Sequence, residues 1–66
     1  MNKENTIKFM EHIIETGGNP SSKVAKELNL SGYFNELCMR NIPKEELVQR
    51  ATYCLENVDR WNRRYN

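Results

Sequence analysis

Apolar residues recur along the chain with helical spacing, and glycine, proline and asparagine interrupt this pattern at three places. The interruptions are Gly17-Gly18-Asn19-Pro20, the segment from Asn29 to Gly32, and Asn41-Ile42-Pro43. They separate four predicted helices. We therefore predict one all-α domain over residues 1–66, in which three short helices pack on one long C-terminal helix.

The first predicted helix runs from about Lys3 to Thr16. Its apolar residues fall within one arc of a helical wheel, opposite charged residues; they are Ile7, Phe9, Met10, Ile13 and Ile14. Gly17 and Gly18 follow directly, and glycine at this place is typical of a left-handed helix C-cap. We expect the chain to turn there.

The second helix is predicted to begin between Pro20 and Ser22. Asn19 before Pro20 suits an N-cap, and Ser21 or Ser22 suits the same role. The apolar face comes from Val24, Ala25 and Leu28. Asn29 then tolerates the left-handed conformation that a tight turn requires.

The third predicted helix has Ser31 as its cap, ends near Asn41 and buries Tyr33, Phe34, Leu37 and Cys38. The sequence around its start resembles the A-x-x-L-G-x-S core of helix-turn-helix regulators, through Ala25, Leu28, Asn29, Leu30 and Ser31. In that family the alanine lies where the two helices touch, the glycine makes the turn, and the serine opens the recognition helix. The resemblance covers about twenty residues and implies a DNA-binding segment over residues 19–41. The sequence departs from the family at Asn35, where the family has an apolar residue.

Charge enters as a second criterion for DNA binding. The chain carries ten Lys and Arg against nine Asp and Glu, for a net charge of +1. Most cations have an acid one helical turn away, in the pairs Glu4–Lys8, Lys23–Glu27, Glu36–Arg40, Glu46–Arg50, Glu56–Arg60 and Asp59–Arg63. Such pairing weakens the field that phosphate binding uses. The DNA interpretation assigns the groove-facing side chains to Ser31, Tyr33, Asn35 and Arg40.

The fourth predicted helix runs from Pro43 to Tyr65. Its apolar residues alternate at spacings of four and three, through Leu47, Ala51, Cys54, Val58, Trp61 and Tyr65. Such a seam fits either the core-facing stripe of a monomer or the contact between two copies in a homodimer. For the dimer we assign Leu47, Ala51, Cys54, Val58 and Trp61 to the interface.

The end of this helix interleaves aromatic residues with arginines. Trp61 and Tyr65 continue the apolar seam to a level that the shorter helices do not reach, while Arg60 and Arg64 lie beside them in sequence. Tryptophan, tyrosine and arginine are the residues most enriched at binding hot spots. We therefore predict a protein-binding site at Trp61, Tyr65, Arg60 and Arg64.

Candidate reactive residues are few. His12, the single histidine, has no Cys, Asp or Glu partner at metal-ligand spacing, and Cys38 and Cys54 are expected to be buried thiols without a disulfide. We predict no catalytic residue, no metal site and no cofactor. No apolar run approaches the length of a membrane span, and we expect a cytoplasmic protein.

These features give two hypotheses. The first is a small non-enzymatic regulator, an inhibitor or adaptor, that binds a protein partner through the aromatic end of the fourth helix. The alternative is a helix-turn-helix-like DNA-binding regulator that uses residues 19–41 and dimerises through the helix over residues 43–65.

Overall fold

The computed structural model describes the backbone of residues 3–65 and the side chains of residues 3–58. It contains four helices, α1 (Lys3–Glu15), α2 (Ser22–Glu27), α3 (Ser31–Arg40) and α4 (Lys44–Tyr65). The prediction of a small all-α domain with one long C-terminal helix is confirmed, and each predicted boundary lies close to the observed one.

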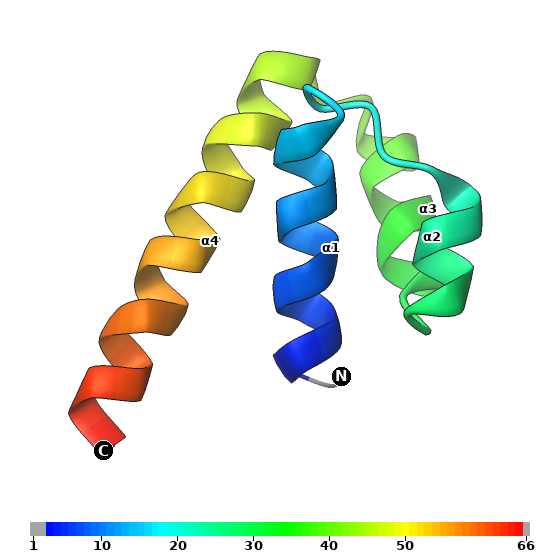
Figure 1. The fold of residues 1–66 in the computed structure, drawn as a ribbon. Coiled ribbons are helices and arrows are strands. Elements are labelled where there is room, and N and C mark those ends of the chain that lie inside the picture. The colour runs from blue at the N-terminus through cyan, green and yellow to red at the C-terminus, as the bar shows by residue number, and fades with distance from the viewer. Residues whose placement is uncertain (1–2, 66) are drawn as a thin grey trace.

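The helices pack as two pairs. Figure 1 shows α1 lying between α4 on one side and the α2–α3 pair on the other, with α1 and α4 running in opposite directions. The core forms where the pairs meet, and its buried side chains come from all four helices and the turn before α3: Phe9, Met10, Ile13, Ala25, Leu30, Leu37, Leu47 and Ala51. Because α1 contributes to both contacts, it is the central element of the fold.

The end of α1 is a two-glycine turn, as the sequence predicts. Gly17 and Gly18 have φ values of 66° and 87°. The Gly18 N–H donates to the Ile13 carbonyl at 2.8 Å, and the Gly17 N–H donates to the Ile14 carbonyl at 3.0 Å. This pair of bonds is the Schellman arrangement, which satisfies carbonyls that the helix end leaves without partners.

The sequence predicts the start of α2 and the turn after it correctly, but it does not predict the start of α3. Ser21 is the N-cap of α2, and its side chain accepts a hydrogen bond from the Lys23 N–H at 3.2 Å. Asn29 has a left-handed φ of 62°, as expected. The prediction of Ser31 as the cap of α3 is wrong, because Leu30 takes the N-cap position without a side-chain cap bond. The Leu30 side chain is buried in the core instead, so packing fixes this helix start.

The expectation of two buried thiols is also wrong. Cys38 is exposed and Cys54 is half-buried, and both are free. Leu37 is the residue of α3 that enters the core, and Cys38 lies about 100° further round the helix. The apolar arc of α3 is therefore wider than the surface that its neighbours cover.

His12 connects α1 to the start of α2. Its Nε2 atom accepts a hydrogen bond from the Ser21 N–H at 3.0 Å, and its ring stacks on Phe9 with 6.2 Å between the ring centroids. The same serine caps α2, so His12 holds the capping residue in place.

We expect His12→Ala to lower the free energy of unfolding by about 1–3 kcal/mol, because the partly buried Ser21 N–H loses its acceptor. His12→Gln keeps an acceptor on a long side chain and should cost less. Urea unfolding followed by circular dichroism measures both values. Equal stability of wild type and His12→Ala would contradict a structural role for this hydrogen bond.

Candidate functional site

The turn between α2 and α3 is built by buried side chains and backbone hydrogen bonds. Ala25 is fully buried, and its carbonyl accepts a hydrogen bond from the Leu30 N–H at 2.7 Å. Asn29 takes the left-handed position where the family has glycine. The Leu30 side chain packs into the core and is 4% exposed. The backbone hydrogen bond and the burial of Ala25 and Leu30 thus hold α2 and the start of α3 together.

The exposed face of α3 contains three of the four residues of the DNA hypothesis. Ser31, Asn35 and Arg40 are exposed. Arg40 is held by Glu36, with 3.1 Å between guanidinium and carboxylate atoms. Leu30 and Leu37 point into the core, and their spacing places Asn35 outward.

Tyr33, the fourth residue of that set, lies apart from it. Its ring is half-buried and meets Phe9 edge-on, with 6.0 Å between centroids and 79° between ring planes. Burial raises the pKa of Tyr33 above its ordinary value of 10.0, and the neighbouring Cys54 raises that pKa further. Arg50 acts in the opposite direction and has a smaller effect than these two. Tyr33 is thus a boundary residue of the core.

The raised pKa of Tyr33 predicts a loss of stability in alkali. As pH rises above 10, the unfolded chain releases the phenol proton before the folded chain does, so the free energy of unfolding falls until the folded-state pKa is passed. Tyr33→Phe keeps the ring contact with Phe9 and should remove this part of the pH dependence. Phenolate absorbance should show a late-ionising component that Tyr33→Phe removes. A late component that survives Tyr33→Phe would contradict the assignment.

The apolar seam of α4 is divided between the core and the region beyond it. Leu47 and Ala51 are buried within the single chain, so the first half of the seam faces α1. Cys54 is half-buried and packs against the core, while Val58 is half-buried. The side chain of Trp61, the fifth residue of the predicted dimer contact, lies outside the described residues. The structure places Leu47 and Ala51 in the monomer core and packs Cys54 against it.

The four residues of the predicted protein-binding site, Arg60, Trp61, Arg64 and Tyr65, have side chains outside the described residues. The backbone there is helical, since α4 continues to Tyr65. Figure 1 shows this end of α4 leading away from the start of α1. The site therefore remains a prediction, placed by the course of the helix.

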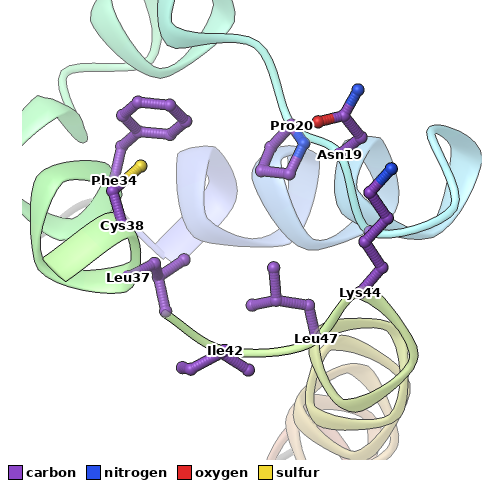
Figure 2. Close-up of a pocket in the computed structure, with 9 residues that line it drawn as sticks. Asn19, Pro20, Phe34, Leu37, Cys38, Ile42, Lys44 and Leu47 are labelled. Atoms are coloured by element: carbon purple, nitrogen blue, oxygen red, sulfur yellow. The ribbon is translucent and has the colours of Figure 1, made fainter. Parts of the chain in front are cut away.

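A surface pocket that sequence reasoning missed lies at the other end of α4. Its volume is about 230 Å³, and its lining comes from the α1–α2 turn, α3, the α3–α4 linker and the first turn of α4: Gly18, Asn19, Pro20, Phe34, Leu37, Cys38, Ile42, Lys44 and Leu47. Figure 2 shows Asn19, Pro20 and Lys44 on one side and Phe34, Leu37 and Cys38 on the other. Ile42, an apolar residue isolated in a linker, is the sequence signal that points to this pocket.

Two exposed ion pairs that the sequence predicts lie on α3 and α4 in the described part of the chain. Glu36–Arg40 and Glu46–Arg50 have charged atoms 3.1 Å and 3.3 Å apart. Both pairs are exposed, so they add little stability. They do neutralise cations on α3 and α4, which keeps the charge of these surfaces balanced.

The described part of the chain has neither a cluster of metal-binding side chains nor a membrane-spanning helix. Residues 3–58 contain no group of three or more His, Cys, Asp or Glu side chains that are placed to hold a metal ion. No helix in the described part has the length and apolar composition that a membrane crossing requires. Comparisons with protein-family models, with curated proteins and with solved structures find no match to this chain.

Proposed function

We propose that this chain is a small non-enzymatic, cytoplasmic regulator, an inhibitor or adaptor, that binds a protein partner through the C-terminal end of α4. The observation that carries the proposal is the unequal length of the two paired helices. α4 has 22 residues and α1 has 13, so α4 is about 14 Å longer than its partner. The last turns of α4 therefore extend past the cover that α1 supplies.

The burial of the apolar residues of α4 also decreases after Ala51. Ala51 is 1% exposed, and Cys54 and Leu55 are half-buried against the core. The apolar seam continues in sequence to Trp61 and Tyr65. An amphipathic helix can bind a second protein by laying its apolar face into a groove of that protein. We assign Trp61 and Tyr65 as apolar anchors, with Arg60 and Arg64 as polar contacts at the rim.

The experiment compares affinity capture by four forms of the full chain from cells that express it: wild type, Trp61→Ala, Tyr65→Ala and Tyr53→Ala. Tyr53 is a matched control, since it is an aromatic residue of α4 with 66% exposure in the first part of the helix. We expect partners that wild type and Tyr53→Ala retain to be lost with Trp61→Ala. Equal capture by all four forms would refute the assignment.

Self-association is a separate outcome for the same end of α4. Sedimentation equilibrium of wild type and Trp61→Ala distinguishes it from binding to another protein. A dimer that Trp61→Ala dissociates would assign the seam to a second copy of the chain. If both forms are monomers, the partner that covers the seam is a different protein.

A second candidate function is DNA binding, which the turn between α2 and α3 favours. The left-handed φ of Asn29 and the complete burial of Ala25 support this candidate, since they suit the turn and helix-contact positions of the family that the sequence resembles. The test is fluorescence anisotropy of labelled duplex DNA at about 50 and 200 mM salt, since phosphate contacts weaken steeply over that range. Binding that collapses with salt and weakens in Asn35→Ala would favour this function over protein binding. No binding at the lower salt would exclude it.

A further inference from the structure

The pocket beside the first turn of α4 has a chemistry of its own and lies at the opposite end of α4 from the proposed protein-binding site. Ligand binding at this pocket is therefore independent of whether that site binds a partner. Three properties of the pocket narrow the class of its ligand: its size, the separation of its polar and apolar walls, and the charges around its rim.

The size of the pocket fits a single residue. Its volume of about 230 Å³ lies below the range of roughly 300–1,000 Å³ that holds drug-sized ligands and cofactors. Phe34, Leu37, Ile42 and Leu47 supply apolar walls from three different segments. Such walls can enclose one branched or aromatic side chain. Binding is then favourable because the apolar surface of that side chain is removed from water.

The polar wall adds an anion-binding group. Figure 2 shows the Lys44 ammonium group and the Asn19 side chain on the same side of the pocket. Among the described side chains no acidic group lies at ion-pair distance from Lys44; Glu36 and Glu46 pair with Arg40 and Arg50 instead. Lys44 is also the first residue of α4, where the helix dipole favours negative charge. A carboxylate on this wall would meet an ammonium group and an amide donor.

The neighbouring acids limit how much negative charge the ligand carries. Glu45 and Glu46 occupy the first turn of α4 and are exposed. Glu46 is partly neutralised by Arg50 at 3.3 Å, while Glu45 would repel a multiply charged group. A ligand with one carboxylate fits this balance better than a phosphate does.

We propose that the pocket binds the carboxyl-terminal residue of a partner polypeptide, with an apolar last side chain. The side chain lies between Phe34, Leu37 and Ile42, and the terminal carboxylate contacts the Lys44 ammonium group and the Asn19 amide. Capture of a chain terminus by a small pocket with an anion-binding wall is an established mode of peptide recognition. A terminal apolar residue supplies the apolar group and the single carboxylate together.

The first test is an NMR titration of the ¹⁵N-labelled full chain with N-acetyl-leucine, which mimics an apolar chain terminus. N-acetyl-leucine amide, which lacks the carboxylate, is the matched control ligand. We expect amide shifts at Gly18, Asn19, Cys38 and Lys44, with the acid binding about two- to fivefold tighter than the amide, as for an exposed ion pair. Lys44→Met should remove this preference, and Lys26→Met, which changes an exposed lysine of α2, should retain it.

Three results would overturn the proposal. They are equal binding of acid and amide, shifts that cluster away from the pocket, and no shifts at ligand concentrations that saturate weak millimolar sites. Octanoate is an additional ligand, because it carries the same carboxylate on a linear chain. Tighter binding of octanoate than of N-acetyl-leucine would assign the pocket to a fatty-acyl ligand and refute a peptide terminus.

The exposed Cys38 thiol gives a second readout that does not depend on NMR. Cys38 lines the pocket, so an occupied pocket should slow its alkylation by N-ethylmaleimide in a Cys54→Ser background. We expect N-acetyl-leucine to slow the reaction about twofold at half-saturation. An unchanged rate at a saturating concentration would show that the ligand binds elsewhere.

Discussion

Phe9→Ala is expected to lower the free energy of unfolding by about 3–5 kcal/mol, the usual cost of removing a buried aromatic side chain. Phe9 is 0% exposed. It meets Tyr33 edge-on and stacks on His12, so its ring contacts α3 as well as its own helix. A folded chain of 66 residues is stable by roughly 3–10 kcal/mol in total. The substitution therefore removes a large part of the whole stability.

Circular dichroism at 25 °C and a thermal melt measure this effect. We expect Phe9→Ala to show a reduced helical signal and a melting temperature lowered by well over 10 °C, given about 4–8 °C per kcal/mol in a domain of this size. Phe34→Ala makes the same chemical change at a half-buried position and should cost less than half as much. Met39→Ala, at 86% exposure, should change stability by under about 0.5 kcal/mol.

If Phe9→Ala and Phe34→Ala lowered the free energy of unfolding equally, the core would not be centred on α1. The pocket lined by Phe34 would then be as well packed as the interior. The comparison thus tests the division of the fold into a buried core and an open pocket.

The helices and their ends could be predicted from the sequence because local chemistry determines them. Gly17 and Gly18 adopt the left-handed turn that they favour, and Asn29 does the same. Asn41 ends α3 with a φ of 57°, at the interruption that the sequence shows. Each of these residues acts through its own backbone preference, which does not depend on the neighbouring helices.

The pairing of helices and the exposure of some apolar residues could not be predicted in the same way. The apolar arc of α3 includes Cys38, but the neighbouring segments cover only the side of the helix that carries Leu37. The pocket has the same origin. It forms where Gly18, Phe34 and Lys44 meet, and these residues are brought together only by the packing of four helices.

The candidate sites also differ in how far the sequence alone could predict them. The α4 site rests on a heptad spacing and a helix length, which the sequence contains. The DNA-contact set assumed a single exposed face, which carries Ser31, Tyr33, Asn35 and Arg40. The structure separates Tyr33 from that face because Tyr33 packs on Phe9 across the interface between α1 and α3. A helical wheel shows which residues share a side but does not show which side a neighbour covers.

Gly18→Ala is the second substitution with a large expected effect, and it is unfavourable for two independent reasons. Gly18 has a φ of 87°, a conformation that costs an L-residue about 1–2 kcal/mol. A Cβ atom built on Gly18 also overlaps the Lys44 carbonyl oxygen and lies 2.8 Å from Lys44 Cα. Backbone cannot move aside as a flexible side chain does, and such overpacking typically costs a further 1–3 kcal/mol or so. We expect a total loss of about 2–5 kcal/mol.

Gly17→Ala is the matched control for this prediction. Gly17 has a similar φ of 66°, but a Cβ atom there meets nothing within 4 Å. It should therefore show the backbone cost alone, about 1–2 kcal/mol, in the same urea unfolding experiment. The difference between the two variants isolates the contact between the α1–α2 turn and the start of α4. Equal losses would mean that this contact relaxes freely, and the close approach that places Asn19 beside Lys44 would no longer fix the polar wall of the pocket.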